Sequence, residues 1–219
     1  MTEIIAEISG NHAGSLSKAI ALIVTAKNVG ADAVKFQCFS PERQAVKRNR
    51  PEVLALAGGV PLIDLYRKVW TPWDWFPILI QTCKNEGIAW FSSVFDPLDV
   101  AYLETLNCPR YKISAFEMLD WELIRAVKET GKPIIMSVRP TENVTVLHAT
   151  NYDGTVPRLG ISDHGADIAW IALSPDVPMV EWHLKLPGVE TPDSEFSLTP
   201  DEMREKINAI RSAKGADRG

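Results

Sequence analysis

The chain has few cysteines and no cysteine pattern of a disulfide-rich or zinc-binding protein. Only three of its 219 residues are cysteine, Cys38, Cys83 and Cys108, and no two of them have the C-x-x-C spacing. A small odd count without that spacing argues against a disulfide framework and a structural zinc site, and it fits a reducing compartment. We therefore expect a cytoplasmic protein.

Long apolar runs and an excess of basic charge are also missing. No stretch approaches the roughly 18 apolar residues of a membrane span, and the start, MTEIIAEISGNH, carries acids early, unlike a signal peptide. The formal net charge is −5, so a nucleic-acid-binding role is not expected. The single basic cluster, RQAVKRNR at 43–50, fits a solvated loop better than a phosphate-backbone patch.

The sequence does contain a series of short apolar strands, most of them followed by a helical pattern. The expected strands cover 4–9, 32–39, 88–95, 110–116, 132–138, 143–150, 158–164 and 179–186. The expected helices cover 16–30, a segment opened by Thr71 as N-cap, 97–106, 119–130, 166–173 and 197–214.

This alternation predicts the fold class. Strands that alternate with helices form parallel β-α units, so eight strands predict an α/β protein, a (β/α)8 TIM barrel. The barrel is expected to be reduced, because helices are missing after strands 5 and 6. One domain over 1–219 is the economical interpretation, with a frayed tail from about 213.

Polar residues interrupt every expected strand, mostly near its carboxyl end. In VEWHLKL at 180–186, for example, apolar residues alternate with Glu181, His183 and Lys185. Buried parallel strands are usually almost unbroken Val, Ile and Leu, and the carboxyl ends of barrel strands form the active-site face. One polar residue at a strand end is more often a structural hydrogen-bond partner than a catalyst. Charged residues on most strands instead predict a site that binds an anion and a cation.

Two groups of residues within this ring indicate ligands. His164 and His183 end neighbouring strands, so their imidazoles could converge on one divalent metal ion. Spacing alone leaves a metal site and a pair of structural histidines equally open. Lys35, Lys112 and several serines could bind a phosphate group, although no glycine-rich loop marks such a site.

The motifs resemble, in order, those of the N-acetylneuraminate (sialic acid) synthase family, the NeuB-like synthases. The resemblance covers nearly the whole chain and rests on AEISGNHAGSLSKAIALIVTAKNVGADAVKFQ, FSSVFD, YKISAFE, TGKPIIMS, LHAT, GISDH, VEWHLKL and TPDSEFSLTPDEM. It implies a (β/α)8 barrel and a transferase of carbohydrate biosynthesis. Such an enzyme condenses phosphoenolpyruvate with an aldehyde sugar, N-acetylmannosamine or a related N-acyl hexosamine, to a nonulosonic acid and phosphate. The resemblance also implies a divalent metal cofactor, Mn²⁺ or Mg²⁺.

The resemblance further implies roles for individual residues. The metal ligands would be His164 and His183. The residues that bind the substrates would be Lys35, Gln37, Ser93, Lys112, Ser137, Asn151 and Ser162, and the catalytic carboxylates would be Glu7, Glu117, Glu181 and Asp193. Glu117 or Glu181 would stabilise positive charge on phosphoenolpyruvate, and Glu117 or Asp193 would move protons.

Several positions depart from the family's pattern. Ala115 stands where the family has a phosphate-binding serine, and SVRP at 137–140 replaces S-T-G-M, with Arg139 either an anion ligand or a solvated loop residue. The antifreeze-like domain that usually follows the barrel is not expected. Two alternatives therefore stay open: the same chemistry on a smaller aldehyde, or a barrel that binds a metal or an anion without turnover. The helix-deficient side of the barrel suggests a homo-oligomer that covers it.

Overall fold

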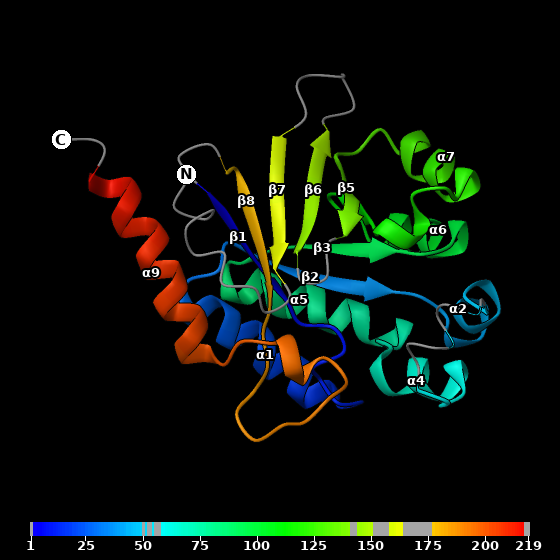
Figure 1. The fold of residues 1–219 in the computed structure, drawn as a ribbon, viewed down its shortest axis with the longest axis horizontal. Helices are drawn as coiled ribbons and strands as arrows, with labels where there is room; N and C mark the ends of the chain where they lie inside the picture. Colours follow the sequence, from blue (N-terminus) through cyan, green and yellow to red (C-terminus); the bar gives the residue numbers. More distant parts are fainter. Residues whose placement is uncertain are drawn as a thin grey trace.

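The computed structural model describes residues 2–49, 51, 54, 58–140, 144–150, 158–163 and 177–216. Its eight strands follow one another in chain order around a closed barrel, which the pairing of β1 with β8 completes (Figure 1). The strands are β1 (Glu3–Glu7), β2 (Ala33–Cys38), β3 (Ala89–Val94), β4 (Tyr111–Ile113), β5 (Ile134–Pro140), β6 (Val144–Thr150), β7 (Arg158–Asp163) and β8 (Met179–His183). The predicted α/β class is confirmed.

One strand, β6, runs opposite to its neighbours. It pairs antiparallel with both β5 and β7, whereas the other adjacent pairs are parallel, and its arrow in Figure 1 points the other way. Only residues 141–143 join β5 to β6, and 151–157 join β6 to β7. A parallel crossover needs about a dozen residues or more. The sequence predicted a reduced (β/α)8 barrel in which all the strands are parallel, and the direction of this strand corrects that prediction.

Two expectations about helices concern residues outside the described part of the chain. The helices expected to be missing after strands 5 and 6 would fall in 141–143 and 151–157, and the short helix expected at 166–173 lies in a segment that is likewise not described.

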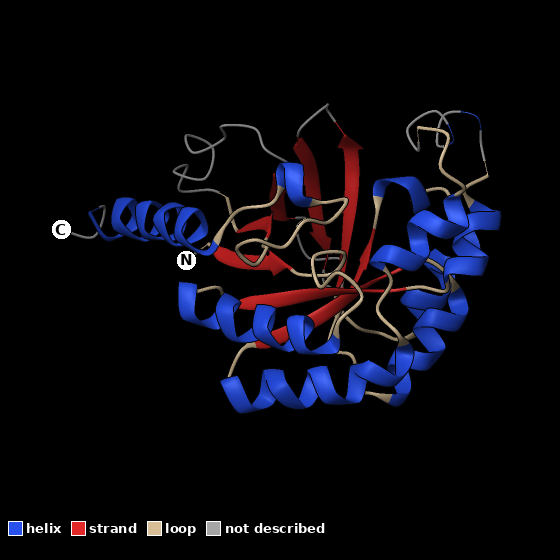
Figure 2. Cartoon of the chain, turned by 90° about the horizontal axis from the view of Figure 1, so that it is seen from below, coloured by secondary structure: helices blue, strands red, loops and turns tan. Residues whose placement is uncertain are grey.

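Helices lie outside the strands (Figure 2). They are α1 (Leu16–Val29), α2 (Pro41–Lys47), α4 (Leu62–Val69), α5 (Phe76–Glu86), α6 (Pro97–Thr105), α7 (Trp121–Glu129) and α9 (Pro200–Ala216), with 3₁₀ turns η1 (Trp73–Trp75), η2 (Ala115–Glu117) and η3 (Ser194–Phe196). Within the described residues, none of these helices has the length and apolar character to cross a membrane.

Local capping signals set the ends of α1 as predicted. The Ser15 side chain accepts a hydrogen bond from the backbone N–H of Lys18, and Gly30 ends the helix with φ 96°. The expected helix start at Thr71 is wrong. α5 begins at Phe76, because Trp73–Trp75 form the turn η1 and the Thr71 hydroxyl lies 3.2 Å from His12 Nε2.

Candidate active site

The interior of the barrel has an apolar layer and, beside it, a polar layer. The apolar layer is made of Ile5, Ala33, Phe91, Ile135 and Met179, one from each of five strands. Residues two apart in a strand share a face. Two positions further along the same strands, toward their carboxyl ends, are the buried residues Glu7, Lys35, Ser93, Ser137 and Glu181. Strand periodicity therefore places five of the predicted site residues in one interior layer.

Two lysines and two glutamates form a charged cluster in this polar layer. Lys35 Nζ lies 2.6 Å from Glu7 Oε2 and 3.0 Å from Glu181 Oε1. Lys112 Nζ, from β4, donates hydrogen bonds of 2.8 Å to both carboxylate oxygens of Glu181. Each of the four side chains is at most 5% exposed. Because two positive and two negative charges meet here, the cluster is neutral when all four groups are ionised.

Serine hydroxyls border the cluster. Lys35 Nζ donates to Ser93 Oγ at 3.3 Å, and Ser162 Oγ donates to Glu181 Oε1 at 3.1 Å. Ser137 is buried in the same layer on β5. Hydroxyl and ammonium groups together are the donors that phosphate and carboxylate groups require. The arrangement is thus chemically suited to a small anion with two acidic groups.

The cluster shifts the pKa values of its members in different directions. Burial lowers the pKa of Lys112 to about 8, and the nearby Glu181 carboxylate opposes that effect only in part. Burial also acts to lower the pKa of Lys35, but Glu181 and Glu7 outweigh it, so this pKa is raised. Burial acts to raise the pKa of Glu181, yet Lys112 and Lys35 outweigh it and hold that pKa well below its usual range. Glu181 is therefore a carboxylate in the neutral pH range.

A histidine and an aspartate meet at the carboxyl end of β8. His183 Nδ1 lies 3.3 Å from Asp193 Oδ2, with the two side chains 8% and 22% exposed. The Phe196 ring packs edge-on against the imidazole, with 4.9 Å between centroids. Gly10, at φ +77°, approaches Asp193 so closely that a Cβ there would lie 2.8 Å from Asp193 Oδ2. The loop after β1 therefore leaves room for the aspartate beside the histidine.

Only one of the two predicted metal ligands, His183, lies within the described residues. His164 lies outside the described residues, and the part of the chain that is described contains no group of three His, Cys, Asp or Glu side chains arranged to hold a metal ion. Asp163 pairs in register with Trp182, and each is followed in the sequence by one of the two histidines. An imidazole nitrogen and a carboxylate oxygen suit a divalent transition-metal ion. His183 and Asp193 thus fit such an ion, and the pairing of His164 with His183 stays a prediction.

Glu117 belongs to a second charged group, centred on Arg48. Glu117 Oε1 accepts hydrogen bonds from Arg48 Nε at 3.0 Å and Nη2 at 2.5 Å, and Oε2 accepts one from the Ser114 hydroxyl. The guanidinium lies over the rings of Phe95 and Phe116, at 5.6 and 4.7 Å from their centroids. Ser114, next to the substituted Ala115, is therefore engaged with Glu117.

The basic cluster at 43–50 is neither a solvated loop nor a phosphate-backbone patch in the described structure. Three of its side chains pair with acids that belong to other elements: Arg43 with Asp99 of α6, Lys47 with Asp120 at the start of α7, and Arg48 with Glu117 of η2. The available signal was the spacing of Arg43 and Lys47, because residues four apart share one helix face, and Arg48 follows as the C-cap residue of α2. Sequence analysis missed the pairing because the acids are distant in the chain.

Arg48→Met is expected to lower the free energy of unfolding by about 3 kcal/mol, because it leaves the Glu117 carboxylate, 2% exposed, without its cation. Urea denaturation measures the change. Arg67→Met is the matched control, since Arg67 and its partner Glu42 are 57% and 63% exposed and should contribute about 0.5 kcal/mol. Equally small effects of both substitutions would show that Glu117 does not depend on Arg48.

The remaining predicted site residues differ in their placement. Gln37 follows Lys35 by two positions on β2 and is half-buried, at the next level toward the carboxyl end. Asn151 lies outside the described residues, but Thr150 before it pairs with Ile134, the first residue of β5. Because β6 is reversed, it ends at the amino end of the parallel strands. The prediction that this strand end contributes to the carboxyl-end face is therefore corrected.

Lys185 and Arg139 are two further polar residues that the sequence analysis named. The Lys185 ammonium donates to the Ser194 carbonyl at 2.8 Å, so it holds the segment after β8. The side chain of Arg139 lies outside the described part, so its role stays open.

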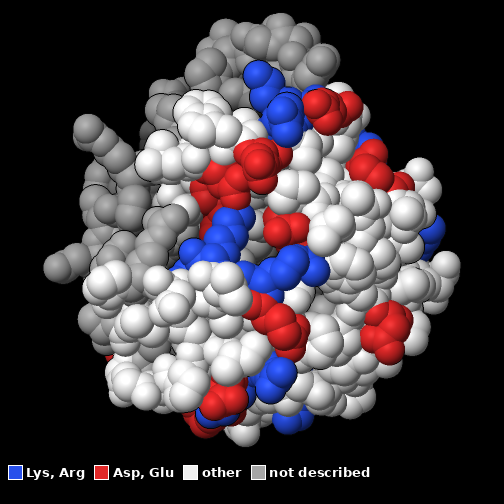
Figure 3. Space-filling view, turned by 90° about the vertical axis from the view of Figure 1, so that its right-hand side faces the viewer, with Lys and Arg blue, Asp and Glu red and all other residues white. Residues whose placement is uncertain are grey.

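Charged side chains gather on the face toward which β2 and β3 point, where basic and acidic groups alternate near the centre (Figure 3).

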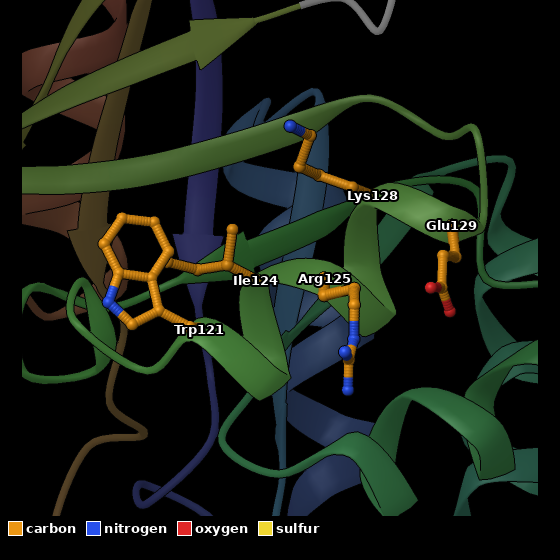
Figure 4. A pocket seen from close by; sticks show the side chains of 5 residues that line it. All are labelled: Trp121, Ile124, Arg125, Lys128 and Glu129. Carbon is orange, nitrogen blue, oxygen red and sulfur yellow. The ribbon is translucent and has the colours of Figure 1, made fainter.

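A separate hollow of about 290 Å³ lies along α7, lined by Trp121, Ile124, Arg125, Lys128 and Glu129 (Figure 4). Trp121 is 72% exposed there. The expected homo-oligomer, which would cover the helix-deficient side of the barrel, stays a prediction.

Known proteins resemble this chain in sequence. Pseudaminic acid synthase of Campylobacter jejuni is 32% identical over 256 residues, which cover 97% of this chain and 74% of the relative. N-acetylneuraminate-9-phosphate synthase of Homo sapiens is 25% identical over 254 residues, covering 97% of this chain and 70% of the relative. Both alignments are longer than the 219 residues of this chain, so these relatives contain residues that it lacks.

Solved structures share the fold. An N-acetylneuraminic acid synthetase from Leptospira borgpetersenii superposes with a TM-score of 0.79 at 18% identity, covering 100% of this chain and 85% of the other. Spore coat polysaccharide biosynthesis protein SpsE from Bacillus subtilis superposes with a TM-score of 0.75 at 23% identity, covering 99% and 69%. The sequence model described as NeuB family matches residues 22–152, more than half of the chain. The predicted resemblance is thereby confirmed: the chain belongs to the NeuB family.

Proposed function

We propose that this protein condenses phosphoenolpyruvate with an open-chain N-acyl hexosamine, giving a nonulosonic acid and inorganic phosphate. The observation that carries the proposal is the buried cluster of Lys35, Lys112, Glu7 and Glu181 in the polar layer of the barrel. Two buried ammonium groups provide positive charge for a small anion, and two carboxylates face them. Relatives named as synthases of pseudaminic acid, N,N'-diacetyllegionaminic acid and N-acetylneuraminate 9-phosphate support this class of reaction.

In the proposed reaction, the cluster changes partners when the substrate binds. The phosphate and carboxylate groups of phosphoenolpyruvate replace the glutamates as partners of Lys35 and Lys112. Ser93 and Ser162, which already bond to members of the cluster, provide hydroxyl donors. Glu7 and Glu181 are then available for positive charge in the transition state.

The bond changes follow from the substrates. C3 of phosphoenolpyruvate attacks the aldehyde carbon, and positive charge develops at C2, where Glu181 stabilises it. Water adds to C2, and the resulting C2 hydroxyl then becomes a carbonyl as the C–O bond to phosphate breaks. The departing phosphate takes up the hydroxyl proton, and Lys35 and Lys112 hold it as it leaves. A divalent cation, Mn²⁺ or Mg²⁺, held by His164 and His183, supplies Lewis-acid polarisation of the aldehyde when bound.

Asp193 is the better of the two candidates for moving protons. Glu117 is engaged by Arg48 and Ser114, whereas Asp193 lies beside His183 and is 22% exposed, which leaves it accessible to water and substrate. In the proposed reaction, Asp193 accepts a proton from the attacking water and returns it to the new hydroxyl oxygen at the former aldehyde carbon.

The test is phosphate release from phosphoenolpyruvate in the presence of Mn²⁺, with and without N-acetylmannosamine. Sugar-dependent release that is lost in His183→Ala and His164→Ala is expected. Release only with shorter aldehydes would establish the same chemistry on a smaller acceptor. Binding of phosphoenolpyruvate without release, for every aldehyde tried, would overturn the proposal in favour of a binding protein.

A further inference from the structure

One buried amide ties the loop after β1 to the segment after β8. Asn11 is 0% exposed. Its Nδ2 donates to the Leu184 carbonyl and to Ser197 Oγ, both at 2.9 Å, and its Oδ1 accepts from Thr191 Oγ1 at 2.6 Å. These partners stand at the beginning, in the middle and at the end of 184–197. A single side chain therefore holds this segment at three points.

The segment held by Asn11 carries Asp193. Ser197 Oγ, which accepts from Asn11, donates to the backbone carbonyl of Asp193 at 2.6 Å. On the other side, the Thr191 N–H donates to Ser194 Oγ at 2.8 Å, which closes a turn around the aspartate. Asn11 is thus linked to the backbone around Asp193 through Ser197 on one side and through Thr191 on the other. The Asp193 carboxylate lies 3.3 Å from His183 Nδ1.

Backbone hydrogen bonds hold the two ends of the segment independently of Asn11. The Leu184 N–H donates to the Glu7 carbonyl at 2.9 Å, and the Leu198 N–H donates to the His183 carbonyl at 2.8 Å. The ends are therefore attached to the barrel without the amide. The middle of the segment, where Asp193 lies, is held by the hydrogen bond of Asn11 with Thr191 and by that of Lys185 with the Ser194 carbonyl.

We propose that Asn11 is a positioning residue, which sets the Asp193 carboxylate beside His183 for the reaction. This inference rests on the proposed function, in which Asp193 moves a proton. An amide suits the task, because it provides two donors and one acceptor that are all satisfied here and adds no charge beside Asp193. Gly10 completes the arrangement, because a larger residue there would meet the Asp193 carboxylate.

A double-mutant cycle between Asn11 and Asp193 tests the proposal. Asn11→Ala is expected to lower kcat about tenfold in the wild-type background and less than about twofold in Asp193→Ala, because residues that act through one another are not additive. Asn85→Ala, which removes an exposed amide bonded to Gln81 at 2.8 Å, is the matched control and should leave kcat unchanged. A tenfold loss in both backgrounds would assign Asn11 a general structural role and overturn the proposal.

Thr191→Val provides a milder version of the same test if Asn11→Ala does not fold. It removes only the hydrogen bond to Asn11 Oδ1 and the contact with Ser194 Oγ. We expect a fall in kcat of about threefold that again disappears in the Asp193→Ala background. An equal fall in both backgrounds contradicts positioning through Asp193.

A second readout needs no turnover. The protein has four histidines, so the ring signals of His183 can be assigned in an NMR spectrum by their loss in His183→Ala. At constant pH, Asn11→Ala is expected to move the His183 ring signals toward their positions in Asp193→Ala. Unmoved His183 signals in a folded Asn11→Ala protein overturn the inference. If the wild type releases no phosphate but the signals move, the proposed reaction fails and the positioning role stands.

Discussion

Lys35→Met is expected to lower kcat/KM for phosphoenolpyruvate about a thousandfold. Lys35 Nζ is shared between Glu7 and Glu181 at 2.6 and 3.0 Å, and it is the cation that the proposed reaction needs for the substrate's acidic groups. Truncation of one partner of a buried charge pair costs about 2–5 kcal/mol in binding, which is about 30- to 5,000-fold. The phosphate-release assay measures the loss, and Lys27→Met, at an exposed lysine that bonds the Gly87 carbonyl, is the control.

The same substitution is expected to destabilise the fold, because it leaves one buried carboxylate in excess. Lys35→Met/Glu7→Gln restores the balance, since Lys112 still pairs with both oxygens of Glu181. We expect the double variant to regain most of the free energy of unfolding lost in Lys35→Met, about 3 kcal/mol, without regaining activity. Recovery of activity in the double variant would show that Lys35 only neutralises Glu7 and does not bind the substrate.

Local signals in the sequence were enough to place the layers of the site. Strand periodicity fixes which residues share a face, so Ile5 and Glu7, or Ala33 and Lys35, had to follow one another along the interior once the strands were assigned. The ends of α1 were likewise fixed by Ser15 and Gly30. These features depend on backbone geometry over a few residues, which is why a single sequence contains them.

The direction of β6 was not predicted, because an apolar strand has the same periodicity in either direction. The signal was the length of the connection. Four residues, RPTE, separate the expected strands 132–138 and 143–150, and that is too few for a parallel crossover. The resemblance to a regular barrel favours a parallel strand, and that prediction was wrong for β6.

Charge pairing across the chain was also beyond sequence reasoning. Arg48 and Glu117 are 69 residues apart, as are Lys112 and Glu181. Composition showed that charges interrupt the strands, but the barrel closure and the path of α2 decide which acid each base meets. The consequence for function is that Glu117, one of the carboxylates expected to act on the substrate, is bound to Arg48.

The affinity for phosphoenolpyruvate is expected to fall above pH 8. Lys112 has a pKa lowered to about 8 by burial, and the charged groups that face it are Glu181 on β8, Lys35 on β2 and Glu7 on β1. Above that pH, Lys112 becomes a neutral amine and loses its attraction for an anion. The second ionisation of a phosphate, at about pH 6, is already complete at pH 8, so the charge of the substrate does not change above that pH. Titration calorimetry should show about a tenfold rise in Kd per pH unit above pH 8.

The stability of the fold should change in the opposite direction over the same interval. Between about pH 8 and the ordinary lysine pKa of 10.5, the unfolded chain binds a proton at Lys112 that the folded chain does not. The contribution of Lys112 to the free energy of unfolding therefore rises with pH while binding falls. If alkaline unfolding caused the loss of binding, the affinity and the free energy of unfolding would both fall as the pH rises. Lys112→Arg keeps a cation throughout, since arginine has a pKa above about 12, so the step near pH 8 should vanish. A step that persists in this variant would assign the titration to another group.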